Sequence, residues 1–488
     1  MVNLKDILYK VKLISISGAT DIAIDAIQFD SRIVGAGDVF IAIKGTQVDG
    51  HEFISKAVSQ GAVAIVCEDI PMEIHPEVTY VQTDNSAKAL GIMADNYFGH
   101  PSEKLKLVAV TGTNGKTTTV SLLHQLFMNL GYHTGMISTV QNQINNAVIP
   151  ATHTTPDALQ LNSLLKKMVE AGCNVVFMEA SSHAIEQERM AGLKLAGAVF
   201  TNISHEHLDY HKTFDNYIKA KKKLFDDLPS NAFALVNVDD KRGMVMLQNT
   251  KASKYTYSLK MMATYKAKVL SNSLQGLELN IDQKDVWFRQ IGYFNAYNLL
   301  AAYASAHLLE EEGEEVLMNL SQIELKNGRF EQVPNNAGIT AVVDYAHTPD
   351  ALENVLQTID NIRTGNEQVL TVVGCGGNRD TAKRPLMAEI ACRFSDRVIL
   401  TSDNPRFEEP EAIIADMQKG IPVSQMRKVT NLPDRKEAIK LACSFAQKGD
   451  IILVAGKGHE TYQEIKGERS HFDDKEVVHE MLSLIHNK

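Results

Sequence analysis

The sequence predicts an α/β protein of three domains. Three observations lead to this fold class. The chain has 488 residues, and about 150 residues per domain is a common size. An apolar strand at Leu105–Val110 meets a glycine-rich turn and then an apolar-periodic helix from Thr117 to about Leu130, which opens a βαβ unit. Strand and helix patterns alternate again after residue 338, and such alternation is typical of a mostly parallel sheet.

Two polar turn clusters predict the domain boundaries. Pro101-Ser102-Glu103 ends a smaller N-terminal α/β domain, residues 1–102, whose strands include Val39–Ile43 and Ala62–Val66. The cluster at 334–338 separates a central domain, residues 103–333, from a C-terminal domain, residues 334–488. The C-terminal domain has three strand candidates with helical patterns between them: Ile339–Val343, Val369–Val373 and Ile451–Val454.

Composition excludes several classes of protein. The net charge is −10, and duplex nucleic acid is bound by concentrated positive charge. Apolar runs are too short to span a bilayer, and the start, Met1–Gly18, has the charges of an amphipathic element rather than a signal peptide. The five cysteines lack the CxxC spacing of a zinc knuckle, and an odd number does not suggest a disulfide framework. We therefore expect a cytoplasmic enzyme with no nucleic-acid partner and no membrane insertion.

The turn Thr111–Thr118 is typical of a phosphate-binding loop. Its glycines allow backbone N–H groups to wrap a phosphate, and the helix N-terminus adds positive potential. Lys116 would neutralise phosphate charge, and the Thr117 hydroxyl would hold Mg²⁺. The strict motif requires glycine where Val110 stands, so a plain strand–turn–helix corner is the alternative. The order of strand, Gly-Lys-Thr and helix favours a phosphate-loop ATPase-like central domain.

A second strand, Val175–Met178, ends at Glu179. A carboxylate at such a strand end can serve the metal of a nucleotide site. An ordinary exposed glutamate is the alternative, and the two interpretations weigh about equally on this signal.

Three histidines lie within residues 205–211. His207 and His211 are four residues apart, which suits a zinc site. A polar loop with one or two structural histidines is the simpler interpretation, and composition alone favours it.

Lys221 occupies an unusual position in the helical pattern Phe214–Leu228. Tyr217, Ala220, Lys221 and Leu224 have i, i+3, i+4 and i+7 spacing, so they share one face. Lys221 would then point inward while Lys222 and Lys223 point to water. A lysine on an apolar face is unfavourable unless it is paired or chemically altered. Snorkelling along the side chain is the alternative.

Six ordered motifs resemble the signature of the Mur ligases, ATP-dependent amide-forming enzymes of peptidoglycan precursor synthesis. The motifs are Thr-Gly-Thr-Asn-Gly-Lys-Thr at 111–117, Glu-Ala-Ser-Ser-His at 179–183, His-Leu-Asp-Tyr-His at 207–211, Asn295–Asn298, Gly-Arg-Phe-Glu at 328–331 and Asp-Tyr-Ala-His-Thr-Pro-Asp at 344–350. The resemblance covers essentially the whole chain and implies a Rossmann-like C-terminal domain beside the ATP-binding one.

Within the family the chain resembles the branch that adds the third residue of the stem peptide. The resemblance implies that an N-terminal domain binds the UDP sugar of UDP-MurNAc-L-Ala-D-Glu. The implied contacts to this substrate are Ser31, Thr46, Gln47, Val48, Thr154, Thr155, Ser181, Gln187 and Arg189.

The resemblance also implies an ATP site and a metal site. The implied ATP contacts are Gly112, Thr113, Asn114, Gly115, Lys116, Thr117, Thr118, Asn295, Arg329 and Asp344. The implied catalytic residues are Lys116, Lys221 and His207. Lys221 is a carbamate in the family, which would explain an inward lysine, and the implied Mg²⁺ ligands are Thr117, Glu179, His207 and carbamylated Lys221. Histidine is an unusual ligand for hard Mg²⁺.

The motif Asp403-Asn404-Pro405-Arg406 accompanies meso-diaminopimelate in this branch. A guanidinium can grip the distal carboxylate of diaminopimelate bidentately, whereas L-lysine offers only an ammonium there. Glu460 could pair with the distal ammonium, and Arg379 and Gly456 match further contacts of the family. The alternatives are a dinucleotide loop at 374–379, which Arg379 in place of the third glycine disfavours, and a plain Asn-Pro turn at 403–406.

The implied reaction passes the γ-phosphoryl group of ATP to the D-Glu carboxylate, and the amine of diaminopimelate then displaces phosphate. Such a ligase serves cell-wall biogenesis and thereby cell shape and division. We expect a monomer in the cytoplasm. Three rival interpretations remain: another amide ligase of the superfamily, such as folylpolyglutamate synthase, a lysine-adding relative, and a non-catalytic nucleotide-binding protein.

Overall fold

The computed structural model describes residues 2–45, 48–151, 153–325 and 328–486. The chain forms two compact units. The first comprises Met1–Gly112, Thr119–Thr201 and Ile218–Thr256, and the second comprises Thr113–Thr118, Asn202–Tyr217 and Tyr257–Lys488. Among the described residues, no helix has the length and apolar character that a bilayer crossing requires.

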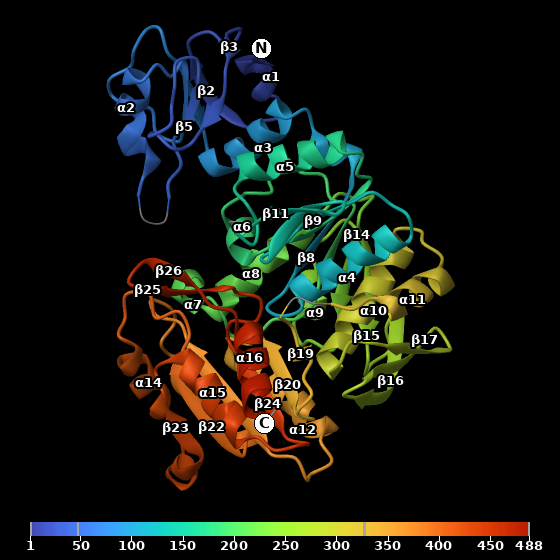
Figure 1. Ribbon diagram of the computed structural model, residues 1–488. Coiled ribbons are helices and arrows are strands. Elements are labelled where there is room, and N and C mark those ends of the chain that lie inside the picture. The colour runs from blue at the N-terminus through green and yellow to red at the C-terminus, as the bar shows by residue number, and fades with distance from the viewer. Residues whose placement is uncertain (1, 46–47, 152, 326–327, 487–488) are drawn as a thin grey trace. The chain divides into compact units, whose positions relative to one another are not determined.

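The first unit begins with a five-stranded sheet, drawn in blue in Figure 1. Its strand order is β2 (Leu13–Ser17), β7 (Thr79–Thr83), β6 (Ala64–Cys67), β5 (Val39–Ile41) and β4 (Ile27–Gln28). All neighbouring pairs are parallel except β2 with β7. Alternate side chains pack on α1 (Leu4–Ile7) and α3 (Ser86–Tyr97) or on α2 (Ile54–Ser59). The segment at 1–18 is thus three short elements, β1 (Val2–Asn3), α1 and the exposed β2, rather than one amphipathic element.

A second sheet of the first unit positions the phosphate loop. The seven strands of this 11-stranded sheet that lie wholly in the first unit have the order β11 (Ala147–Pro150), β10 (Gln141–Ile144), β9 (Thr134–Ile137), β12 (Val175–Glu179), β8 (Lys106–Thr111), β13 (Gly197–Phe200) and β14 (Phe233–Asn237). The five strands from β9 to β14 are parallel. The other elements are α4 (Lys116–Asn129), α5 (Ala158–Glu170), α6 (Ser182–Glu186), α8 (Phe214–Asp226) and α9 (Gly243–Met246). The predicted strand before the loop and helix after it are confirmed within one residue.

The second unit contains a smaller β-rich part and a larger α/β sheet. The boundary between the units falls within β15 (Ser253–Ser258). The smaller part then comprises β16 (Tyr265–Ser273), β17 (Gly276–Ile281), β18 (Lys284–Phe288), α10 (Tyr293–Leu308) and α11 (Gly313–Gln322). The larger sheet has the order β19 (Glu331–Val333), β20 (Thr340–Asp344), β24 (Ile451–Ala455), β21 (Val369–Cys375), β22 (Arg397–Ser402) and β23 (Val429–Asn431). All neighbours in it are parallel except β19 with β20.

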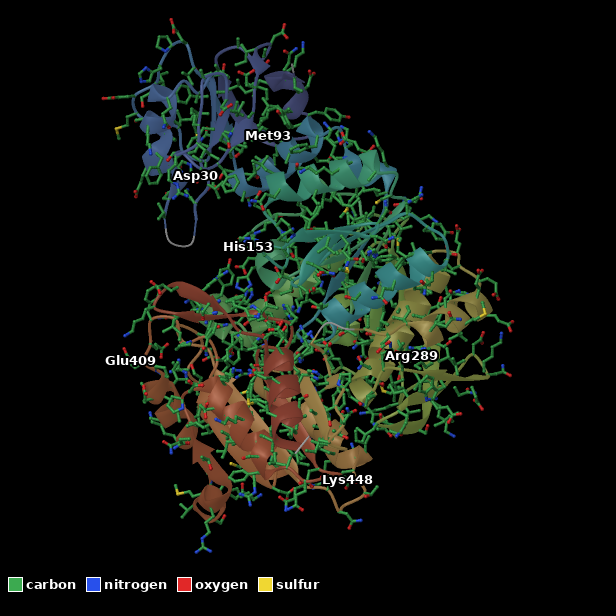
Figure 2. All side chains as sticks on the ribbon, viewed as in Figure 1. Asp30, Met93, His153, Arg289, Glu409 and Lys448 are labelled. Atoms are coloured by element: carbon green, nitrogen blue, oxygen red, sulfur yellow. The ribbon has the colours of Figure 1, made fainter. Side chains whose placement is uncertain are left out.

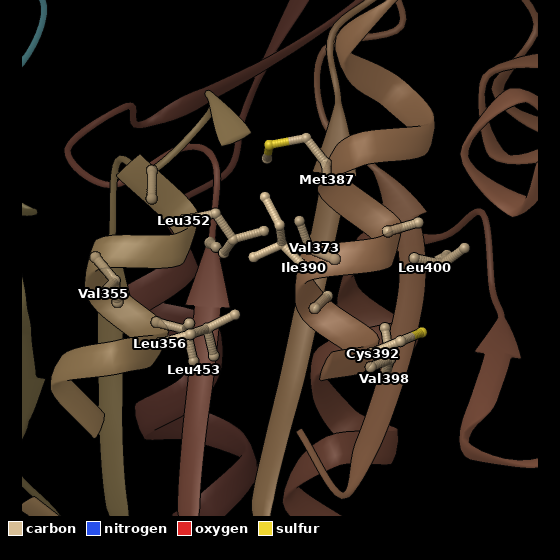
Figure 3. Packing of buried hydrophobic residues seen from close by; sticks show 14 of the residues in the cluster. Leu352, Val355, Leu356, Val373, Met387, Ile390, Cys392, Val398, Leu400 and Leu453 are labelled. Atoms are coloured by element: carbon tan, nitrogen blue, oxygen red, sulfur yellow. The ribbon is translucent and has the colours of Figure 1, made fainter. Parts of the chain in front are cut away.

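Helices cover both faces of the larger sheet. One face carries α12 (Pro349–Ile362), α13 (Lys383–Phe394) and α14 (Pro410–Gln418), and the other carries α15 (Arg435–Phe445) and α16 (Asp474–His486). Figure 3 shows Leu352 and Leu356 of α12 and Ile390 of α13 packed on Val373 and Leu453. Because helices bury both faces, the strands are continuously apolar. The three predicted C-terminal strands are confirmed, and each observed strand ends one or two residues later than expected.

A fully buried ion pair joins the starts of two helices to the ends of two strands of this sheet. Arg435 begins α15 and Asp474 begins α16, and both side chains are 0 % exposed. The guanidinium lies 2.7 Å from Asp474 Oδ2 and donates to the carbonyls of Ser402 and Ala455, the last residues of β22 and β24. The loops that leave these two strands are therefore held to the same charged pair.

We expect Arg435→Met to lower the free energy of unfolding by about 3–5 kcal/mol, since it leaves the Asp474 carboxylate buried without its partner. Urea unfolding followed by far-UV circular dichroism measures this. The control is Lys436→Met, which removes a half-exposed partner of Glu480 and should change stability by less than about 1 kcal/mol. Equal effects of the two variants would contradict the assigned importance of the pair.

His124 in α4 predicts a pH dependence of stability. Burial lowers its pKa from 6.5 to about 4, and the ring lies between Thr134 Oγ1 at 2.8 Å and Gln143 Oε1 at 2.7 Å. In the unfolded chain His124 therefore becomes protonated near pH 6.5, whereas in the folded chain it becomes protonated only near pH 4. Stability should be fully present above pH 6.5 and decline by up to about 3 kcal/mol as pH falls to 4. In urea titrations across this range, His124→Gln should show a smaller decline, and an unchanged decline would count against this assignment.

Candidate active site

The phosphate loop lies between the end of β8 and the start of α4, as the sequence predicts. Gly115 has φ 88°, a left-handed conformation that glycine tolerates best. Lys116 is the first residue of α4 and its Nζ donates to the Thr113 carbonyl at 2.8 Å. Thr117 and Thr118 are buried. The ammonium thus folds back over its own loop, where it can meet phosphate oxygens.

Residues distant in sequence support this loop within the second unit. The Asn114 backbone N–H donates to Asn202 Oδ1 at 2.9 Å, and Asn114 Nδ2 donates to Asp350 Oδ2 at 2.6 Å. Ser204 Oγ donates to the same Asp350 oxygen at 3.2 Å. Burial raises the pKa of the Asp350 carboxyl. Asp350 lies in the first turn of α12, so the loop is fastened to the start of that helix.

The other implied ATP residues also fall in the second unit. Asp344 ends β20 and is buried, and burial raises the pKa of its carboxyl while nearby Arg329 opposes that rise. The Asp344 carboxylate accepts from the backbone N–H groups of Phe330 at 2.5 Å and Ala346 at 2.7 Å. The Arg329 guanidinium lies 4.5 Å from the Tyr345 ring centroid, and its buried Nε has no hydrogen-bond partner among the described residues. Asn295 is buried in the first turn of α10.

Glu179 and Lys221, two implied metal ligands, are both buried in the first unit. Glu179 is 0 % exposed, which overturns the interpretation of an ordinary surface glutamate. Its carboxylate accepts from the Thr139 N–H at 2.9 Å and the Thr139 hydroxyl at 3.0 Å. Lys221 is 1 % exposed, and its Nζ donates to the Gly112 carbonyl at 2.9 Å.

The predicted inward face of α8 is confirmed, because Tyr217, Ala220, Lys221 and Leu224 are all buried. The expectation that Lys222 and Lys223 point to water is wrong. Their side chains are 12 % and 34 % exposed. Each pairs with an aspartate one helical turn onward, Asp226 or Asp227, and such i,i+4 pairs hold the lysine stems against the helix.

The chemistry of these side chains fits Mg²⁺ in part. Mg²⁺ prefers oxygen ligands, which the Glu179 carboxylate and the Thr117 hydroxyl supply. Lys221 fits only as a carbamate, since an ammonium has no lone pair to offer. His207, in the second unit, offers a nitrogen and has φ 56°.

The histidine-rich segment is built from aromatic packing. His205 stacks on Phe214 with ring centroids 4.3 Å apart, and His211, at the end of α7 (Leu208–His211), lies 5.1 Å from the Tyr217 ring. Within the described part of the chain, no group of three or more His, Cys, Asp or Glu side chains is placed to share a metal ion. The packing supports the structural interpretation of His205 and His211 over a zinc site.

Five of the implied UDP-MurNAc-dipeptide contacts form one network in the first unit: Thr154, Thr155, Ser181, Gln187 and Arg189. Arg189 Nη1 donates to the Thr155 carbonyl at 2.7 Å, and its Nη2 donates to Gln187 Oε1 at 2.7 Å. Thr155 Oγ1 donates to the Glu179 carbonyl at 2.7 Å and lies 3.5 Å from Ser181 Oγ. Thr154 contacts Thr139 at 3.0 Å. This polar network places a cation beside the end of β12.

Two of the N-terminal residues implied in sugar binding, Ser31 and Val48, lie in the loops after β4 and β5. Ser31 is buried beside Asp30, which Figure 2 labels and which is held by Arg32 at 2.7 Å. The hydrogen bond from Arg32 lowers the pKa of Asp30 to about 2. Val48 is half-exposed. Thr46 and Gln47 lie outside the described residues.

The implied diaminopimelate contacts gather at the carboxyl edge of the larger sheet. The Gly377 N–H donates to the Asn404 carbonyl at 2.9 Å, and Arg406 Nη1 donates to the Gly377 carbonyl at 3.0 Å. Asn404 Nδ2 donates to Glu460 Oε2 at 2.8 Å. These bonds join the loops after β21, β22 and β24, so the structure brings Asp403, Asn404, Pro405, Arg406, Gly456 and Glu460 together, with Arg379 exposed nearby.

Sequence reasoning missed three residues of this site. Thr139, which contacts Glu179, carries no motif. Asp350 ends the motif at 344–350 and carries no implied contact, and Lys457 lies between the implied contacts Gly456 and Glu460. Lys457 is 0 % exposed, and the signal that could have found it is its position three residues before Glu460.

Comparisons with known proteins agree along the chain. Three family models match: "Mur ligase family, catalytic domain" over residues 23–98, "Mur ligase middle domain" over 110–306 and "Mur ligase, glutamate ligase domain" over 328–458. Two relatives are named UDP-N-acetylmuramoyl-L-alanyl-D-glutamate–2,6-diaminopimelate ligase. The one from Cytophaga hutchinsonii is 60 % identical, covering 99 % of both chains, and the one from Bacteroides fragilis is 53 % identical with the same coverage.

A solved structure with the same name covers 100 % of both chains at 34 % identity, with a TM-score of 0.69. The chain is thus similar to these proteins over its full length, both in sequence and in fold. All three family models that match describe the same family. The chain belongs to the Mur ligase family.

Proposed function

We propose that this chain is an ATP-dependent ligase that joins meso-2,6-diaminopimelate to UDP-N-acetylmuramoyl-L-alanyl-D-glutamate in peptidoglycan precursor synthesis. The full-length relatives named for this reaction support it. The observation that carries the choice of amino acid is the cluster after β22. There a guanidinium, Arg406, and a carboxylate, Glu460, both contact Asn404. Diaminopimelate carries a carboxylate and an ammonium at its distal end. The carboxylate would pair with Arg406 and the ammonium with Glu460.

The Arg406 side chain has N–H donors available to bind the distal carboxylate of diaminopimelate. Among the described residues its side chain donates only through Nη1, to the carbonyls of Gly377 and Asn404. Nη2 and Nε remain for a carboxylate, which can accept two parallel bonds from a guanidinium. L-lysine has no distal carboxylate, so it would leave these half-buried donors without a partner.

ATP would bind the phosphate loop, Gly112 to Thr118, with Asn295, Arg329 and Asp344 contacting the rest of the nucleotide. Lys116 would neutralise charge on the transferred phosphoryl group. Ser31, Thr46, Gln47, Val48, Thr154, Thr155, Ser181, Gln187 and Arg189 would hold the UDP-MurNAc-dipeptide. Fixing the D-Glu carboxylate next to the γ-phosphate makes the first step effectively unimolecular.

The reaction then has two balanced steps. A D-Glu carboxylate oxygen forms a bond to the γ-phosphorus, the bond to ADP breaks, and an acyl phosphate results. The free amine of diaminopimelate attacks the acyl carbon, loses a proton, and inorganic phosphate leaves as the amide forms. Mg²⁺, held by Thr117, Glu179, His207 and carbamylated Lys221, would supply charge neutralisation on the phosphates.

We also propose that the enzyme works in the cytoplasm as a monomer, because one chain supplies contacts for all three substrates. Its product would serve cell-wall biogenesis and hence cell shape and division.

We expect phosphate release from ATP in the presence of UDP-MurNAc-L-Ala-D-Glu and meso-diaminopimelate, and little release with L-lysine. Lys116→Ala is the inactive control and should lose at least about 100-fold in kcat while keeping the far-UV spectrum of the wild type, because it removes transition-state charge stabilisation. Release with L-lysine alone would overturn the proposed amino acid. Release with neither would favour a non-catalytic nucleotide-binding protein.

Arg406→Ala should raise the KM for diaminopimelate about 10- to 100-fold, the loss expected for charged hydrogen bonds, and change the KM for ATP by less than about twofold. Steady-state kinetics with each substrate varied in turn gives both values. Arg393→Ala removes an exposed arginine of α13 that pairs with Glu353 and serves as the control. A parallel rise in both KM values for Arg406→Ala would contradict the carboxylate-gripping role.

A further inference from the structure

A lysine with no part in the proposed reaction lies at the centre of the diaminopimelate cluster. Lys457 follows Gly456 in the loop after β24, and its side chain is 0 % exposed. Its Nζ lies 3.0 Å from Glu460 Oε2, 3.1 Å from Asn404 Oδ1 and 3.7 Å from Asp403 Oδ1. A buried ammonium is unfavourable without such partners. Its three polar neighbours are all residues proposed to touch the substrate, and the ammonium also lies 5.3 Å from the Tyr462 ring centroid.

Lys457 fixes the orientation of the Asn404 side chain. An ammonium and a backbone N–H can only donate. Asn404 Oδ1 accepts from Lys457 Nζ and from the Glu464 N–H at 3.0 Å. The amide nitrogen must then face the other way, where Asn404 Nδ2 donates to Glu460 Oε2 at 2.8 Å. Without Lys457, one of the two donors that hold this amide in place is lost.

Lys457 also orients the Glu460 carboxylate. Both the lysine and Asn404 bond to the same oxygen, Oε2. That arrangement leaves Oε1 to accept from a substrate ammonium. The side chain of Glu460 is 18 % exposed, so this second oxygen can be reached from solvent while the first is held by the protein.

The charge of the cluster follows from the same contacts. Asp403 and Glu460 contribute two negative charges, and Lys457 cancels one. Asp403 is 7 % exposed, and its Oδ1 has no hydrogen-bond partner among the described residues. With Lys457 present, the cluster favours one ammonium beside the carboxylate held by Arg406. With Lys457 absent, the cluster would carry one more negative charge and would favour a more cationic side chain, such as that of L-lysine.

We propose that Lys457 is a specificity-determining positioning residue, which orients Asn404 and Glu460 and sets the charge that makes the ligase prefer diaminopimelate over L-lysine. This inference rests on the proposed function. Lys457 acts through its neighbours and does not touch the reacting atoms.

The test is Lys457→Met, which keeps the length of the side chain and removes its charge. We expect the KM for meso-diaminopimelate to rise at least about tenfold, with the KM for ATP and for UDP-MurNAc-L-Ala-D-Glu within about twofold of wild type. The ratio of kcat/KM for diaminopimelate to that for L-lysine should fall at least about tenfold. A merely structural lysine would lower activity with both amino acids alike, and an unchanged ratio would overturn the proposal.

Two further variants keep the result interpretable. Lys466→Met removes an exposed lysine that pairs with Glu409 and should change neither KM nor the ratio. A cycle with Glu460→Gln tests whether Lys457 acts through Glu460. The double variant loses one positive and one negative charge, so the formal charge of the cluster equals that of the wild type. Relative to Glu460→Gln alone, the added Lys457→Met should change the KM for diaminopimelate by less than about threefold. The full effect in that background would contradict the proposal.

The double-mutant cycle remains informative if Lys457→Met alone does not fold. The KM for diaminopimelate can then be compared between Glu460→Gln and the double variant. Failure of the proposed function looks different. In that case the wild type itself shows no phosphate release that depends on diaminopimelate. Failure of this inference shows an active wild type whose selectivity survives the loss of Lys457.

Discussion

The parallel pairing of strands is the constraint on which the rest of this protein depends. In each of its two main sheets, parallel strands deliver their carboxyl ends to one edge. In the first unit that edge carries the end of β8, from which the phosphate loop starts, and Glu179 at the end of β12. In the second unit it carries Asp344 and the loops that follow Cys375, Ser402 and Ala455. Ligands in open α/β sheets bind outside such carboxyl ends, so chain direction alone collects residues from distant parts of the sequence.

Charge burial at these edges follows a consistent rule. Lys221, Lys457 and Arg435 are all almost fully buried, and each finds an acceptor at a strand end or in the loop that follows it. An unpaired buried charge would destabilise the fold by several kcal/mol, so these contacts are requirements of folding as much as of function. The Arg435–Asp474 pair stabilises the strand ends at Ser402 and Ala455, from which the Asp403 and Gly456 loops start. Arg406 and Glu460, which are proposed to touch substrate, can therefore stay partly exposed without losing their positions.

Much of the fold could be predicted because its signals are local. The strand, turn and helix around Lys116, the apolar strands of the C-terminal sheet and the inward face of α8 all follow from residues close in sequence. The contacts that complete the site are not local. Asn404 and Lys457 are 53 residues apart, and Asn114 and Asp350 are 236 apart. Hydrophobic periodicity carries no information on such pairs. Lys222 and Lys223 show that a helical pattern also does not reveal which lysine side chains are kept from solvent by an ion pair.

The backbone at Arg406 limits which residues could replace the arginine proposed to bind the distal carboxylate. Arg406 has φ 54°, a left-handed conformation that glycine and asparagine adopt readily and β-branched residues resist. Its backbone N–H bonds to the Glu464 carbonyl at 3.0 Å, so the turn is set by the hairpin of β25 (Tyr462–Ile465) and β26 (Glu468–His471) rather than by the side chain. A lineage losing the guanidinium could pass through Asn or Gly with the loop intact, whereas valine or isoleucine would strain it. The backbone conformation at residue 406 thus restricts the tolerated side chains independently of what the side chain binds.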